Sequence, residues 1–124
     1  MIPKHRAWDK FEKEMLDVHG INYDADGVWT KEVFDEEDNG DFIYFSDIEL
    51  LQSTRLLDKN GMEIFEGDIV RDSYGDIFVI EWLDGGFVLT ELYIGGYDHY
   101  YIDVSTKYEI IGNKYEHPHL LEEE

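Results

Sequence analysis

The chain has 124 residues, a formal net charge of −20 and no cysteine, which excludes a disulfide scaffold and catalysis by a thiolate. Its length predicts one compact domain, and its content of 43% hydrophobic and 15% aromatic residues excludes a disordered chain despite the charge. The N-terminal sequence lacks the apolar core of a signal peptide, and no apolar run approaches the ~20 residues of a membrane span, so we expect a soluble cytoplasmic protein.

The first half of the chain predicts short strands separated by polar turns. Apolar side chains in residues 8–18 recur at spacings of three and four, which fits one helical face or two strands joined by a turn; the absence of a cap favours the strands. Further strands are expected at 28–34 and 42–45, on either side of a charged loop. Ser46 and Glu49 have the spacing of a capping box, which predicts one helical turn through Leu50, Leu51 and Gln52.

The segment 58–70 is the most informative part of the sequence. It predicts a glycine-marked turn at 59–61, a strand at 62–65, a second turn at 66–68 and a strand from residue 69. We expect the carboxylate of Asp68 to accept hydrogen bonds from backbone amides of its own turn. Three glycines are expected at positive φ or where a side chain would collide with a neighbouring strand, in structural rather than ligand-binding roles: Gly61, Gly67 and Gly112.

The second half alternates apolar and polar residues more strongly. Strands are expected at 76–83, 87–92, 97–104 and 107–112, with glycine-rich breaks between them. Short strands at this spacing predict a mainly β chain with little helix and a small SH3-like or related β-barrel. The expected organisation is a single domain (1–124) with three parts: an N-terminal β and loop elaboration at 1–57, the barrel at 58–116, and an acidic tail at 117–124.

Three segments resemble the YopX family of phage and prophage proteins. They are His5-Arg6-Ala7-Trp8-Asp9, residues 51–61 (LQSTRLLDKNG) running into 64–70 (IFEGDIV), and residues 108–116 (YEIIGNKYE). Arg55 departs from the family pattern, because such sequences commonly carry glycine there. The resemblance implies a mobile-element origin and a β-rich domain, but no established activity or ligand. The structural motif residues within these segments are Trp8, Asp58, Gly61, Glu66, Gly67, Asp68, Gly112 and Asn113.

No pattern in the sequence points to a catalytic, cofactor-binding or metal-binding residue. An EF-hand loop starting at Asn22 would place Val33 at the twelfth position, where a bidentate glutamate is required. His117 and His119 would share one side of an extended segment, but a metal ion would need further ligands. With 30 acidic residues any carboxylate pair can be proposed, and the chain has no nucleophile elbow or phosphate-binding loop. We therefore predict no enzyme, no cofactor and no metal.

Tyrosines crowd the last third of the sequence. They would line the core with their hydroxyls at its rim, stack single-stranded bases, or form a patch for a protein partner. Base stacking would normally use a cationic groove, which this sequence does not offer, because residues 63–124 hold 15 acidic and only 3 basic residues. The predicted interaction surface consists of Tyr97, Tyr100 and Tyr101.

The leading functional hypothesis is a non-enzymatic protein-interaction or assembly module. Its partner is an unknown protein, with a basic face suggested by the acidic field, and open strand edges make a homo-oligomer a further expectation. We expect no membrane association and no direct nucleic-acid binding, because binding proteins normally neutralise phosphates with Lys and Arg. Two alternatives remain: an acidic DNA mimic that occupies a DNA-binding protein, and a small carboxylate-dependent hydrolase.

Overall fold

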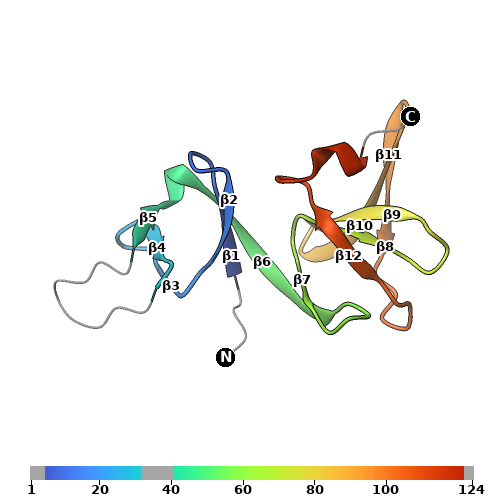
Figure 1. The fold of residues 1–124 in the computed structure, drawn as a ribbon, viewed down its shortest axis with the longest axis horizontal. Helices are drawn as coiled ribbons and strands as arrows, with labels where there is room; N and C mark the ends of the chain where they lie inside the picture. The colour runs from blue at the N-terminus through green and yellow to red at the C-terminus, as the bar shows by residue number, and fades with distance from the viewer. Residues whose placement is uncertain (1–4, 32–40, 122–124) are drawn as a thin grey trace. The chain divides into compact units, whose positions relative to one another are not determined.

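The computed structural model describes residues 5–31 and 41–121 and confirms a mainly β chain. The strands lie in two compact units, Met1–Gln52 and Ser53–Glu124 (Figure 1). The unit boundary falls inside one long strand, β6 (Ile48–Leu57): its first residues pair with a strand of the first unit and its last residues with a strand of the second.

Two small antiparallel sheets form the first unit. One contains the hairpin β1 (His5–Asp9) and β2 (Glu14–Asp17), and the start of β6 pairs with β1. The strand–turn–strand alternative for residues 8–18 is therefore confirmed. The turn is closed by Asp9, whose Oδ1 accepts hydrogen bonds from the amides of Phe11 and Glu12 at 2.9 and 3.0 Å. The second sheet contains β3 (Gly20–Asn22), β4 (Gly27–Trp29) and β5 (Phe42–Tyr44).

The helical turn expected after Ser46 is wrong. The 3₁₀ turn η1 occupies Phe45–Asp47 instead, and its N-terminus has no side-chain cap. Leu50 and Leu51 lie in β6, where Leu50 pairs with Ala7 of β1 and Leu51 is buried. Pairing with a strand more than 40 residues earlier in sequence overrides the local capping pattern. The core of this unit contains Ala7, Val18, Val28 and Ile48.

The second unit is built on a five-stranded antiparallel sheet in the order β11-β10-β9-β8-β12, which curls into a half-barrel (Figure 1). Four strands form a meander and the fifth returns to pair with the first, as expected for an SH3-like sheet. The last part of β6 pairs separately with β7 (Glu63–Phe65). The sheet strands are β8 (Asp68–Arg71), β9 (Ile77–Leu83), β10 (Gly86–Tyr93), β11 (Gly96–Tyr101) and β12 (Glu109–Asn113).

The core of the second unit contains side chains from β8, β9 and β10 of this sheet, together with Ile64 of β7 and Tyr108, which precedes β12. Two-residue turns connect β9 to β10 and β10 to β11. In the first turn Asp84 and Gly85 both have positive φ, which matches the right-handed twist of the flanking strands. The buried core residues are Ile64, Val70, Phe78, Ile80, Leu89 and Tyr108.

Three local features differ from the sequence-based expectations. The strand expected at 28–34 ends at Trp29, and residues 32–34 of that prediction lie outside the described residues. β11 ends at Tyr101 rather than at residue 104, because Asp103 forms a turn in which its Oδ1 accepts hydrogen bonds from the amide and hydroxyl of Ser105. Within the predicted tail, residues Pro118–Leu121 form the 3₁₀ helix η2.

Candidate protein-interaction surface

The five-stranded sheet has two edges, β12 and β11, and they are finished differently. The β12 edge is covered by the turn that follows β6. The amide of Ile110 donates to Oδ2 of Asp58 at 3.1 Å, and the amide of Lys59 donates to the carbonyl of Tyr108 at 2.8 Å. These bonds occupy backbone groups that an uncovered edge strand would offer to another chain.

Asp58 organises the covering turn. Its Oδ1 accepts hydrogen bonds from the amides of Asn60 and Met62 at 2.8 and 2.9 Å, and the residue is 7% exposed. Burial is the largest single influence on its pKa and acts to raise it. The amides of Ile110, Met62 and Asn60, with the charge of Lys59, together outweigh burial and lower the pKa of Asp58 below its ordinary value.

The next turn, between β7 and β8, is held by Asp68. As the sequence predicts, its carboxylate accepts a hydrogen bond from a backbone amide of this turn, that of Phe65 at 2.8 Å. Asp68 is 1% exposed, and Glu66 beside it is partly buried. Gly61 and Gly67, the glycines of the two turns, have φ of 81° and 88°, in the region that favours glycine.

The end of β12 is covered by the C-terminal turn. A Cβ on Gly112 would lie 2.7 Å from Nδ1 of His117 and 3.0 Å from Leu120, so only glycine lets this turn approach the strand. Asn113 holds the turn: its Oδ1 accepts from the amides of Tyr115 and Glu116, its Nδ2 donates to Glu116, and its own amide donates to Nδ1 of His117. Of the predicted motif residues, Trp8 alone lies in the first unit, where it is buried in β1.

The β11 edge carries the three tyrosines that the sequence singles out. Tyr97, Tyr100 and Tyr101 are 60%, 45% and 92% exposed. Within the described residues, no strand pairs with the outer side of β11. Tyr97 and Tyr101 lie on one face of the strand, and Tyr100 lies on the other, where its ring packs edge-on against Phe78 with centroids 5.9 Å apart. The structure therefore places these side chains along one open edge.

A polar chain missed by the sequence reading crosses the sheet beside this edge. The Thr90 hydroxyl lies 2.8 Å from Nδ1 of His99 and 3.2 Å from Oε2 of Glu81. These residues belong to β10, β11 and β9, so the chain connects the edge strand to the interior of the sheet. Thr90 itself is only 2% exposed. The available signal in the sequence was Thr90, a polar residue that interrupts the alternation of polar and apolar residues in its strand.

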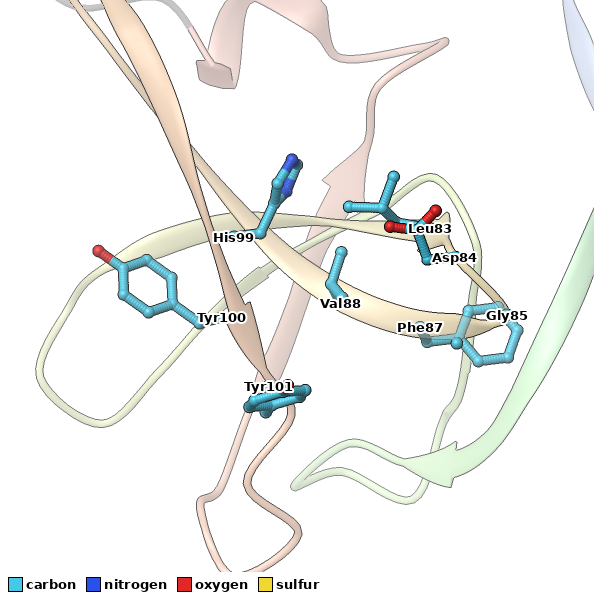
Figure 2. A pocket seen from close by; sticks show the side chains of 9 residues that line it. Leu83, Asp84, Gly85, Phe87, Val88, His99, Tyr100 and Tyr101 are labelled. Atoms are coloured by element: carbon cyan, nitrogen blue, oxygen red, sulfur yellow. The ribbon is translucent and has the colours of Figure 1, made fainter.

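A shallow hollow of about 470 Å³ lies at the end of the β9–β10 hairpin, next to β11. Figure 2 shows His99, Tyr100 and Tyr101 projecting from one strand beside the hairpin residues Leu83 and Phe87. Its lining includes a single carboxylate, that of Asp84, whereas glycoside hydrolysis by the usual route needs two.

The electrostatic surroundings of the two edges also differ. Near β11, burial followed by the negative charges of Asp98 and Glu91 raises the pKa of Tyr93 and of Tyr100. Near β12, the hydrogen bond from Arg71 is the main cause that lowers the pKa of Glu109, and Lys59 contributes. Arg71 and Lys59 lie 2.7 and 3.5 Å from the Glu109 carboxylate.

Neither a metal centre nor a membrane-spanning helix is found in the described part of the chain. Across residues 5–31 and 41–121, no group of three or more His, Asp or Glu side chains is placed to hold a metal ion. No helix in these same ranges has the length and hydropathy needed to cross a bilayer.

These features define a mainly β protein with a half-barrel unit whose sheet, over the described residues, has one covered and one open edge. The chain matches the YopX protein family over residues 4–122 and belongs to that family. It is similar to protein EF1440 from Enterococcus faecalis, known from a crystal structure: the two are 32% identical, with a TM-score of 0.72, and the match covers 98% of this chain and 99% of the other. No curated protein matches the chain.

Proposed function

We propose that this protein is a non-enzymatic protein-interaction or assembly module of a phage or prophage, acting in the host cytoplasm. Its contact surface is the β11 edge with Tyr97, Tyr100 and Tyr101. The observation that carries this proposal is the contrast within one sheet: β12 is covered by side-chain and backbone hydrogen bonds, while β11 is open in the described structure and presents exposed aromatic rings.

Exposed tyrosines on an open edge suit a protein contact for two reasons. Tyrosine is enriched at interfaces because a rigid ring buries a large area and its hydroxyl can still hydrogen-bond. An unpaired strand edge also offers backbone donors and acceptors to an incoming chain. The carboxylates of Glu91 and Asp98 beside these rings favour a partner with a basic face, which would be steered to the acidic protein by the long-range field.

A differential capture experiment tests this proposal. The full chain is used to capture proteins from a host lysate during prophage induction, in parallel with a Tyr97→Ser/Tyr101→Ser variant. A Tyr74→Ser variant is the matched control, because Tyr74 is 89% exposed but lies in the turn between β8 and β9. Light scattering during size-exclusion chromatography measures self-association of each variant.

We expect the double variant to lose a partner, or its self-association, that the wild type and the control retain. Displacement of the captured partner by duplex DNA would identify it as a DNA-binding protein, in line with the DNA-mimic alternative. The proposal fails if the wild type remains monomeric at high concentration and all three proteins capture the same set.

A further inference from the structure

The β10–β11 hairpin determines which backbone amides and carbonyls of β11 point toward β10 and which point outward. Along a strand of an antiparallel pair, every second residue exchanges backbone hydrogen bonds with the partner strand. The backbone amide and carbonyl of each residue in between point away from that strand. Gly96 pairs with Tyr93 across a two-residue turn, so Gly96, Asp98 and Tyr100 exchange bonds with β10. The amides and carbonyls of the remaining residues therefore point outward from the sheet: those of Tyr97, His99 and Tyr101.

The same alternation holds one strand further into the sheet. Gly86 closes the neighbouring two-residue hairpin with Leu83, so Gly86, Val88 and Thr90 bond to β9. The backbone groups of the intervening residues Leu89 and Glu91 then point toward β11, where Leu89 pairs with Tyr100 and Glu91 pairs with Asp98.

A pair of like charges lies across the two strands next to this edge. Glu91 of β10 is directly opposite Asp98 of β11, an arrangement that is destabilising for two carboxylates. Among the described residues, the ion pairs formed by Lys and Arg include neither of them. Tyr93 and Tyr100 lie on the same face of the sheet and supply aromatic rings close by. A cationic side chain placed here would relieve the repulsion and gain contact with a ring.

A second copy of this chain suits the edge less well than a basic segment does. Each copy carries a formal charge of −20, so association of two copies opposes a strong mutual repulsion. An antiparallel pairing of two β11 strands centred on His99 would place Tyr100 of the second copy opposite Asp98, so the pairing supplies no cation there. Charge complementarity therefore favours a partner segment rich in Lys or Arg.

We infer that β11 accepts an extended basic segment of a partner protein as an additional antiparallel strand. The partner exchanges backbone hydrogen bonds with Tyr97, His99 and Tyr101, and its alternate side chains place Lys or Arg beside Asp98 and Glu91. This inference rests on the proposed function and adds the mode of binding and the chemistry of the partner.

The inference predicts which amides of the partner take part. In an antiparallel pair, residues that exchange hydrogen bonds lie opposite each other and share a face. The partner residues that bond to Tyr97, His99 and Tyr101 therefore have side chains on the face of these three. The basic residues beside Asp98 lie on the other face, and their amides point away from the sheet.

A peptide probe tests this directly. The probe is an acetylated and amidated octapeptide that alternates Lys with Val and Thr, titrated into the full-length protein at low ionic strength and followed by the backbone amide NMR signals. The matched control replaces every Lys by Glu. Two further peptides carry N-methyl groups, one on every Val and Thr and the other on every Lys. On the protein side, Tyr97→Pro removes an outward amide, and Tyr97→Ala controls for loss of the ring.

We expect the Lys peptide to bind at least tenfold more tightly than the Glu peptide, with the preference falling as salt is added. N-methylation at Val and Thr should abolish binding, and N-methylation at Lys should preserve it. Tyr97→Pro should weaken binding at least tenfold more than Tyr97→Ala, with both variants retaining a folded amide spectrum.

Other results overturn the inference in distinguishable ways. If the Lys peptide binds but the position of N-methylation makes no difference, strand addition is wrong and the interaction surface remains. If the peptide does not bind and the β11 amides instead become protected as the protein is concentrated, a second copy occupies the edge and the assembly function remains. If neither occurs, and the lysate experiment shows no tyrosine-dependent partner, the inference and the proposed function both fail.

Discussion

The two edge strands of the half-barrel sheet differ in whether other segments of the chain cover their outward-facing backbone groups. β12 is bulged between Ile110 and Gly112 and is covered by two turns, one held by Asp58 and one by Asn113. β11 has a regular register with β10 and, in the described structure, no covering segment. An unpaired strand edge is a hazard for aggregation, so the difference between the two edges supports the proposed role of β11 in binding.

The comparison also separates residues that stabilise the unit from the residues of the proposed contact surface. On the β12 side, Asp58 and Asn113 are buried, and each side chain accepts more than one backbone hydrogen bond. On β11, Tyr97 and Tyr101 are exposed on one face of the strand, whereas Tyr100 also packs against the core residue Phe78. Substitutions on the β12 side should therefore lower stability more than binding, and substitutions of the β11 tyrosines should lower binding more than stability.

The largest expected effect is that of Asp58→Ala. The substitution leaves the amides of Asn60, Met62 and Ile110 without their acceptor, and we expect a loss of about 3 kcal/mol in the free energy of unfolding. Chemical denaturation at pH 7 measures it. Asp58→Asn keeps an oxygen acceptor and should lose less, and equal losses in the two variants would contradict the hydrogen-bond account.

Part of the contribution of Asp58 to the free energy of unfolding should depend on pH. The pKa of Asp58 is lower in the folded protein than its ordinary value of 3.8, so the ionised form favours folding. Its contribution is present above the unfolded pKa and is lost as the pH falls through the folded pKa. The stability difference between the wild type and Asp58→Asn should therefore narrow as the pH is lowered below about 4. A difference that stays constant across this range would show that Asp58 is not responsible.

Gly112→Ala tests the second cover of the β12 edge. The new methyl group collides with the His117 ring, and overpacking of this kind costs about 1–3 kcal/mol. Thermal unfolding measures the loss. In a His117→Ala background the same substitution should cost clearly less, because the nearest atoms of the collision are gone. An unchanged cost in that background would place the strain elsewhere.

Substitutions of Arg55 test the backbone conformation of β6, the strand that leads into the covering turn. It has φ of 65° within the register shift of the β6–β7 pairing, a conformation that costs a non-glycine residue about 1 kcal/mol or more. Arg55→Gly and Arg55→Ala both remove the 4.0 Å ion pair with Glu63, so their difference isolates the backbone. The glycine variant should be more stable by about 1 kcal/mol. Equal stability would mean that the backbone relaxes out of the left-handed region.

The smallest effect on stability is expected on the open edge. Tyr97→Ala and Tyr101→Ala should each change the free energy of unfolding by no more than about 0.5 kcal/mol, as is usual for exposed positions. Equilibrium unfolding and the peptide titration, performed on the same samples, separate stability from binding. A loss of stability comparable to that of Asp58→Ala would show that β11 is a structural edge rather than a binding edge.

Much of this fold was predictable because its signals are local. Glycine-marked turns and alternating apolar residues located β7 to β10 closely, and the carboxylate of Asp68 forms the predicted bond within its own turn. Arg55, which departs from the family's usual glycine, adopts a glycine-like φ. The capping-box pattern at Ser46 failed because the following residues gain more from pairing with β1 than a single helical turn provides.

The candidate surface was only half predictable. The sequence identified Tyr97, Tyr100 and Tyr101 but left open whether their rings line the core or face outward. It also could not show that Asp58 bonds to Ile110, a residue 52 positions later, or that Thr90 bonds to both His99 and Glu81. Such contacts depend on which strands become neighbours.

The sequence by itself determined the β class, the positions of most turns and the acidic character of the protein, because each depends on composition or on neighbouring residues. Only the tertiary structure decided that β12 is the covered edge and β11 the open one. The reason is that strand order arises from long-range pairing, and the side chains that cover an edge come from segments distant in sequence.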